Sequence, residues 1–179
     1  MSTQVRRYFA YGSNLDLEQM ARRCPDAVAL RPARLPNSKL VFRGGLADVE
    51  YAQGQSAFGG VWHVTPECEA ALDRYEGFPA LYLRRYVAAR RGNGGPQRML
   101  FYQMRAQQLY PLAPPSDSYL AGILRGYTAF GATDRDIEAL LQAARVKGNM
   151  FIGRAARERR ETREALAARK THAGEGGMQ

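Results

Sequence analysis

Two short stretches of the chain carry residue types that can do chemistry together. In the first, an aromatic segment stops at Gly12-Ser13-Asn14 and an amphipathic segment follows. Val5 to Tyr11 has the β-branched and aromatic content of a buried strand. Gly12 permits a positive φ and close backbone approach, while Ser13 and Asn14 are good helix N-caps. We therefore expect a strand, a tight loop and a helix, with loop N–H groups placed to hold a carboxylate or a developing alkoxide.

The same loop has a plain structural interpretation, because Gly, Ser and Asn are common in ordinary turns. No Gly-Lys-Ser/Thr follows the first glycine, which excludes a Walker loop, and the further glycines of a dinucleotide-binding fingerprint are missing. The residues alone thus predict an anion pocket without naming its substrate.

The second stretch ends a predicted helix. Thr65-Pro66-Glu67 is a strong helix start, and the helix continues to Tyr75, so that Glu76 lies at its C-terminus. The helix dipole disfavours a carboxylate there, and an aromatic and apolar surrounding would raise its pKa on burial. That surrounding consists of Tyr75, Phe78, Pro79 and Tyr82. A glutamate in this position breaks the local rule, as residues of functional sites do.

Short strands and helices are expected to position these stretches. The predicted strands are 27–34, 38–42, 46–51, 57–64, 82–90 and 99–104, separated by turns at Pro36-Asn37, Gly44-Gly45, Gln53-Gly54-Gln55 and Gly92 to Pro96. Helices are predicted over 16–24 and 65–75, after Ser116, and after Thr133. Gly59 and Gly60 inside a strand indicate a bulge or a close backbone approach.

Composition indicates a packed globule. Of the 179 residues, 45% are apolar, which suffices for a sizeable core. We predict one domain over residues 1–150 and an Arg-rich helical or disordered tail over 151–179. No window approaches the roughly 20 apolar residues of a membrane span, and the N-terminus lacks a signal-peptide pattern. We therefore expect a cytoplasmic protein without a membrane partner.

The net charge of +9 is spread along the chain and favours a solvated Arg-rich surface over a nucleic-acid partner. Cys24 and Cys68 have neither CxxC spacing nor nearby histidines, so buried free thiols are expected. His63 and His172 also lack partners at metal spacing, and no metal site is predicted.

Four stretches together resemble the γ-glutamylcyclotransferase-like family over about residues 5 to 145. They are Tyr8-Phe9-Ala10-Tyr11-Gly12-Ser13-Asn14-Leu15, Gly60-Val61-Trp62, Leu72-Asp73-Arg74-Tyr75-Glu76-Gly77 and Pro114-Pro115-Ser116-Asp117-Ser118-Tyr119. The opening octad is similar to that of the branch acting on γ-glutamyl amino acids, in a bacterial-type member.

The resemblance implies an α+β fold, with a bent mixed β-sheet or small barrel surrounded by short helices. It implies one essential carboxylate, which maps onto Glu76, and no cofactor. The expected partner is a small γ-glutamyl substrate in a cavity over the loop, and a homodimer is left open. The implied substrate-binding residues are Tyr8, Phe9, Ala10, Tyr11, Gly12, Ser13, Asn14, Leu15 and Tyr119.

The implied reaction fits these residue types. The α-amine of a γ-glutamyl compound attacks its own γ-carbonyl, which releases 5-oxoproline and an amine, with Glu76 as general acid/base. The loop N–H groups would hold either the oxyanion or the α-carboxylate. Tyr11 and Tyr119 would orient the substrate or Glu76, or would simply be core aromatics. A non-catalytic module that binds a γ-glutamyl ligand and a nucleic-acid-associated protein remain as alternative functions.

Overall fold

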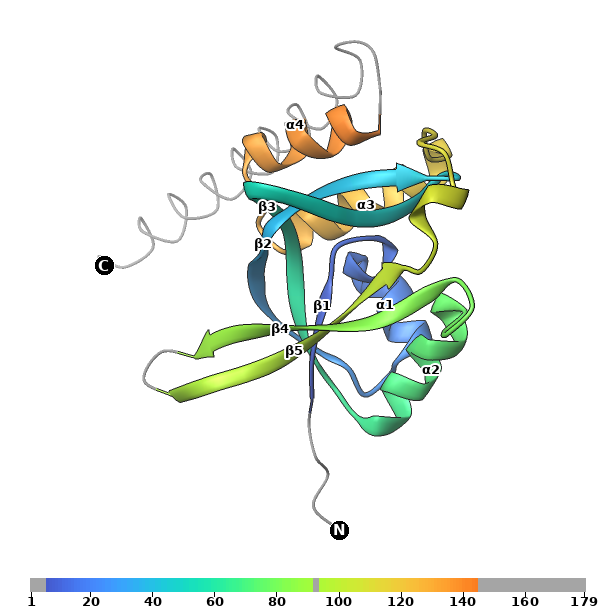
Figure 1. The fold of residues 1–179 in the computed structure, drawn as a ribbon. Helices are drawn as coiled ribbons and strands as arrows, with labels where there is room; N and C mark the ends of the chain where they lie inside the picture. The colour runs from blue at the N-terminus through green and yellow to red at the C-terminus, as the bar shows by residue number, and fades with distance from the viewer. Residues whose placement is uncertain (1–5, 92–93, 145–179) are drawn as a thin grey trace, which may run out of the picture. The chain divides into compact units, whose positions relative to one another are not determined.

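The computed structural model describes residues 6–91 and 94–144, and within them the chain forms five β-strands and four α-helices (Figure 1). The strands are β1 (Arg6–Ala10), β2 (Val28–Arg43), β3 (Leu46–Val64), β4 (Tyr82–Arg91) and β5 (Gly94–Met104). The helices are α1 (Leu17–Arg23), α2 (Pro66–Glu76), α3 (Asp117–Ala129) and α4 (Asp134–Ala143), with short 3₁₀ turns η1 (Ser13–Leu15) and η2 (Gln107–Leu109). The predicted tail lies outside the described residues, and the predicted boundary at residue 150 stays a prediction.

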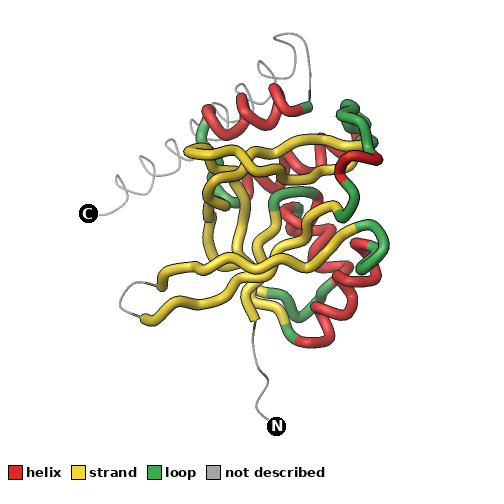
Figure 2. Tube along the Cα trace, viewed as in Figure 1, coloured by secondary structure: helices red, strands yellow, loops and turns green. Residues whose placement is uncertain are grey.

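The five strands form one mixed sheet in the order β2-β3-β1-β5-β4. β1 pairs antiparallel with β3 and parallel with β5, and the other pairs are antiparallel. Because β1 is the central strand, its last three residues, Tyr8 to Ala10, are buried. The predicted α+β fold with a bent mixed sheet is confirmed, and Figure 2 shows strands β2 and β3 bending along their length.

The prediction of four short strands between residues 27 and 64 was wrong, because β2 and β3 form one long antiparallel hairpin. Two of the predicted breaks face each other across this hairpin. Asn37 adopts a left-handed conformation with φ 49°, and its Oδ1 accepts a hydrogen bond of 3.1 Å from the amide of Gly54. The ladder register shifts at this point, so the bulge absorbs both breaks. The third break, Gly44-Gly45, is the hairpin turn.

The β4–β5 hairpin also extends further than predicted, because β5 begins at Gly94 rather than Met99. Among residues 6–91 and 94–144, β1 pairs with β5 at Met99 and Leu100, and the first part of β5 pairs with β4 alone. Proline, here Pro96, is found in such edge segments rather than in central strands, because it cannot donate a ladder hydrogen bond.

Three of the predicted helix starts are confirmed by their caps. Thr65 accepts from the amide of Cys68 at the start of α2, and Ser116 accepts from Tyr119 at the start of α3. Thr133 and Asp136 form a capping box at α4. Glu76 is the last residue of α2, because Gly77 follows in the left-handed conformation that ends helices.

Close backbone contacts hold the 3₁₀ turn η1 against the rest of the fold. A side-chain carbon at Gly126 of α3 would lie 2.4 Å from the Cβ of Leu15, so only glycine allows this approach. At Gly59 such a carbon would lie 2.2 Å from the carbonyl oxygen of Ala10. The close approach predicted for the strand glycines is therefore present, and it fixes the loop after β1 in space.

Candidate active site

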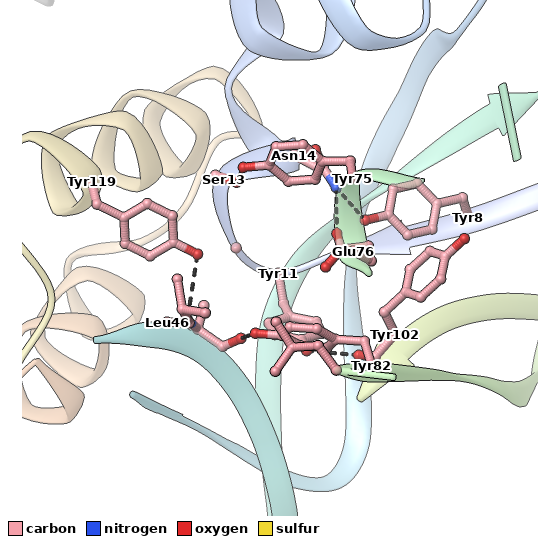
Figure 3. A pocket seen from close by; sticks show the side chains of 13 residues that line it. Tyr8, Tyr11, Ser13, Asn14, Leu46, Tyr75, Glu76, Tyr82, Tyr102 and Tyr119 are labelled. Atoms are coloured by element: carbon pink, nitrogen blue, oxygen red, sulfur yellow. Dashed lines mark hydrogen bonds between the residues drawn. The ribbon is translucent and has the colours of Figure 1, made fainter. Parts of the chain in front are cut away.

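A cavity of about 200 Å³ lies where the loop after β1 meets the end of α2 (Figure 3). Segments of β1, β3, β4, β5 and α3 complete its wall. Six of the thirteen lining residues are tyrosines, so the wall combines apolar rings with hydroxyl groups. The lining residues are Tyr8, Tyr11, Gly12, Ser13, Asn14, Leu46, Ala47, Tyr75, Glu76, Leu81, Tyr82, Tyr102 and Tyr119.

The loop that borders the cavity differs in two ways from the sequence prediction. Gly12 has φ −110°, so it does not use the positive φ that glycine permits. Its small size matters instead, because a Cβ there would lie 3.0 Å from the Cβ of Ala47. The N-cap of α1 is Asp16, which accepts from the amides of Glu18 and Gln19, and this cap frees the Ser13 and Asn14 side chains for other contacts.

The loop also presents backbone donors. Within the described part of the chain, no acceptor takes a hydrogen bond from the amide of Gly12, Ser13 or Asn14. All three residues line the cavity. A buried or half-buried amide without a protein partner needs another acceptor, and a bound anionic oxygen is well suited to be one.

Glu76 is partly buried in the cavity wall, and its Oε1 accepts a hydrogen bond of 2.9 Å from Asn14 Nδ2. Burial raises the pKa of Glu76 to about 7, although the positive charge of Arg23 and the hydrogen bond from Asn14 act in the opposite direction. The predicted rise in this pKa is therefore confirmed. Tyr75 and Tyr82 belong to the cavity wall as part of its surrounding, whereas Phe78 and Pro79 do not.

The tyrosine hydroxyls are held by specific partners. Tyr11 donates to the carbonyl oxygen of Tyr102 at 2.6 Å and Tyr82 donates to that of Ala47 at 2.7 Å. Tyr119 accepts from the amide of Ala47 at 3.3 Å, and burial raises its pKa to about 12. Burial also keeps the pKa values of the other buried tyrosines above their ordinary range, so these phenols are neutral at physiological pH.

The structure does not bring all predicted binding residues to the cavity. Phe9, Ala10 and Leu15 are fully buried in the core and do not line it. Phe9 lies on the opposite face of β1 from Tyr8, as strand alternation requires, and packs against Gly59. Leu15 packs against Gly126. The other six predicted residues do line the cavity: Tyr8, Tyr11, Gly12, Ser13, Asn14 and Tyr119.

Sequence reasoning missed five residues of the site. Leu46, Ala47, Leu81 and Tyr102 line the cavity, and Arg23 contacts its loop. Tyr102 carried a usable signal, because a buried hydroxyl on a strand needs a partner, here Asp73 Oδ1 at 2.8 Å. Arg23 carried none, since a basic residue in the last turn of a helix is ordinary.

Comparisons with known proteins identify the family. The family described as gamma-glutamyl cyclotransferase, AIG2-like matches residues 8–121. The gamma-glutamylcyclotransferase of Bos taurus is 33% identical over 131 residues, which cover 66% of this chain and 68% of that protein. The chain belongs to this γ-glutamyl cyclotransferase family.

Solved structures agree with this membership. A structure named gamma-glutamyl cyclotransferase matches at a TM-score of 0.67 and 27% identity, covering 82% of this chain and 90% of that one. A crystal structure of an uncharacterised Homo sapiens protein matches at a TM-score of 0.68 and 29% identity, with 76% and 86% covered. The matches share the mixed sheet and its surrounding helices.

Three further observations concern the cysteines, metal-ligating groups and membrane-spanning helices. Cys24 and Cys68 are both buried free thiols, as predicted. Within residues 6–91 and 94–144, no group of three His, Cys, Asp or Glu side chains gathers at metal-binding distance. No helix in the same part of the chain has the length and apolar character needed to cross a membrane.

Proposed function

We propose that this member of the family is a γ-glutamylcyclotransferase that cyclises the γ-glutamyl group of its substrate to 5-oxoproline, with Glu76 as general acid/base. One observation carries the proposal: a glutamate with a pKa of about 7 lies in the same cavity wall as three backbone amides that have no acceptor in the described chain. An acid with a pKa near the working pH is effective in both directions of proton transfer.

The reaction needs only groups that the substrate and this cavity supply. Glu76 takes a proton from the α-ammonium group, and the freed amine attacks the γ-carbonyl carbon of the same molecule. A C–N bond forms within the new ring, and the carbonyl oxygen becomes an oxyanion. The ring nitrogen formed by the attack still carries one proton too many. When this intermediate collapses, the bond to the leaving amine breaks, Glu76 gives its first proton to that amine and then accepts the second from the ring nitrogen. The second proton also passes to the amine, which leaves as an ammonium ion. Atoms and charge therefore balance without a hydrolytic water.

The loop amides supply the electrostatic part of the mechanism. Gly12, Ser13 and Asn14 receive either the α-carboxylate or the oxyanion, and one donor aimed at an oxyanion is worth roughly 10²–10³ in rate. Tyr8 adds a hydroxyl whose oxygen already accepts from Asn14 at 2.9 Å, so its hydrogen is oriented away from Asn14. This arrangement favours a folded substrate with its amine close to Glu76.

The size and edge of the cavity support a small substrate. A volume of about 200 Å³ is small for a binding pocket and suits a glutamyl group. Leu46 and Tyr75 line the cavity and remain 38% and 48% exposed, so they form its mouth. We place the leaving amine at this mouth.

The test is Glu76→Gln, with 5-oxoproline release measured on γ-glutamyl amino acids, γ-glutamylamines and glutathione. The variant should fold and bind substrate but lose turnover by about 10²–10⁴-fold. Glu67→Gln is the matched control, because Glu67 is an exposed glutamate in the first turn of the same helix. It should keep wild-type turnover.

Two outcomes would contradict the proposal. If Glu76→Gln turned over normally, Glu76 would not be the acid/base. If the wild-type protein bound γ-glutamyl compounds tightly but released no 5-oxoproline, the binding-module alternative would replace the enzyme.

A further inference from the structure

Arg23, the last residue of α1, contacts two parts of the site, the loop after β1 and Tyr75 of α2, and a residue of its own helix. Its Nη1 donates to Asn14 Oδ1 at 2.5 Å and to Ser13 Oγ at 3.1 Å. Its Nη2 donates to Gln19 Oε1 at 2.7 Å, one helical turn earlier. The guanidinium carbon also lies 3.4 Å from the centre of the Tyr75 ring. Tyr75 is the residue directly before Glu76 in the chain.

These contacts determine which way the Asn14 carboxamide faces. A guanidinium group has donors and no acceptor, so the oxygen of the carboxamide must face Arg23. Both hydrogens of Nδ2 are then directed to the other side, where they are donated to Glu76 Oε1 and Tyr8 Oη, each at 2.9 Å (Figure 3). Asn14 is only 3% exposed, so water does not compete freely for these groups.

We propose that Arg23 is a positioning residue, which acts through Asn14 to keep a hydrogen-bond donor on Glu76 and to hold the loop against α2. Its effect on catalysis rests on the function proposed above, whereas its effect on the Glu76 carboxyl does not. Without Arg23 the carboxamide can rotate and turn its oxygen toward Glu76. A carbonyl oxygen beside a carboxylate disfavours the ionised form, so the same change alters the proton affinity of the acid.

The charges around Glu76 make this effect measurable. Five tyrosines from the surrounding elements interact electrostatically with Glu76, and all five are neutral near pH 7. They are Tyr8 from β1, Tyr11 from the following loop, Tyr82 from β4, Tyr102 from β5 and Tyr119 from α3. Arg23 supplies the positive charge that acts on Glu76 from α1. Tyr75, from α2 itself, lines the cavity and has the guanidinium group of Arg23 against its ring.

The direct experiment is an NMR titration of the Glu76 carboxyl carbon, which needs no substrate. It compares the wild-type protein with Arg23→Met, Arg23→Lys and Arg22→Met. Arg22 is the matched control, because it is the neighbouring arginine on α1 and is exposed. In Arg23→Met the pKa of Glu76 should rise by roughly one unit, since both the charge and the fixed amide donor are lost.

The conservative variant separates positioning from general destabilisation. Lys also lacks an acceptor, so Arg23→Lys should keep the Glu76 pKa close to the wild-type value. In the 5-oxoproline assay, Arg23→Met should lower kcat about tenfold and move the acidic limb of its pH profile upward, while Arg23→Lys recovers part of this loss. If Arg23→Met does not fold, the Glu76 titration is made on Arg23→Lys and Arg23→Gln instead.

An unchanged Glu76 titration in Arg23→Met would overturn the inference, and so would an equal shift in Arg22→Met. If the wild-type protein released no 5-oxoproline, the proposed function would fail, while the titration would still decide the role of Arg23.

Discussion

Helix α2 carries two kinds of acid along one face, and the contrast between them explains the site. Glu69 is only 2% exposed and forms ion pairs with Arg6, at 2.7 Å, and with Arg84. Asp73, one turn later, pairs with Arg84 and accepts from the Tyr102 hydroxyl. Glu76, the last residue of the helix, lies at the cavity and has the neutral amide of Asn14 as its hydrogen-bond donor.

The pKa values follow from these partners. Although burial acts to raise the pKa of Asp73, the hydrogen bonds from Arg84 and Tyr102 outweigh it and hold this pKa below its ordinary value. For Glu76 burial dominates and the pKa rises to about 7. Burial alone therefore does not make an acid reactive. A buried acid becomes a proton carrier when the fold gives it a donor but withholds a direct ion pair.

The largest loss of stability predicted by this contrast is at Glu69. Glu69→Gln removes the anion between two guanidinium groups, so the free energy of unfolding should fall by about 3 kcal/mol. Chemical denaturation measures this loss, and Glu67→Gln again serves as the exposed control. The kcat of the folded protein should not change, because Glu69 does not line the cavity. A stable variant with impaired turnover would show that the two acids do not have separate roles.

Replacing Glu76 should raise the free energy of unfolding instead of lowering it, and the size of this gain should depend on pH. Folding raises its pKa from 4.5 to about 7, so the folded protein binds this proton more tightly than the unfolded chain does. Stability from this group is fully present below pH 4.5 and is lost as the pH rises through 7. Glu76→Gln should therefore match the wild type at pH 4 and be more stable by about 3 kcal/mol at pH 8. Denaturation curves at both pH values measure the difference.

Asp73→Asn is the counterpart in that experiment. Because its pKa is lowered by folding, its stabilising contribution is present at neutral pH and is lost as the pH falls. The variant should be less stable than the wild type at pH 7 and approach it in acid. If the stability of both variants, relative to the wild type, changed with pH in the same direction, the opposite contributions assigned to Glu76 and Asp73 would be contradicted.

The acid on the cavity side could be predicted from sequence because its signals are local. Thr65 starts the helix and Gly77 ends it, so the position of Glu76 at a helix C-terminus follows from neighbouring residues. The central strand and its loop could be predicted for the same reason. These local patterns predicted where the cavity lies and which acid has a raised pKa.

The remaining features depend on contacts between residues far apart in sequence. The bulge that joins β2 and β3 into one hairpin needs Asn37 opposite Gly54, and neither residue alone indicates this. The cap of α1 is a local exception: Asp16, rather than Ser13 or Asn14, accepts from the amides of Glu18 and Gln19. Leu46 and Ala47 reach the cavity only through the pairing of β3 within the sheet.

The smallest predicted effect extends the contrast from acids to tyrosines on helix α3. Tyr119 lines the cavity. Tyr127 does not line it; its side chain is only 2% exposed and packs against Phe58. Removing a hydroxyl that contacts substrate costs about 1 kcal/mol, so Tyr119→Phe should raise KM about fivefold with kcat little changed. Tyr127→Phe should leave KM unchanged, and steady-state kinetics on one γ-glutamyl amino acid compares the two. Equal KM values in both variants would make Tyr119 a core aromatic that supports Ala47, and would restrict substrate recognition to the loop, Tyr8 and Glu76.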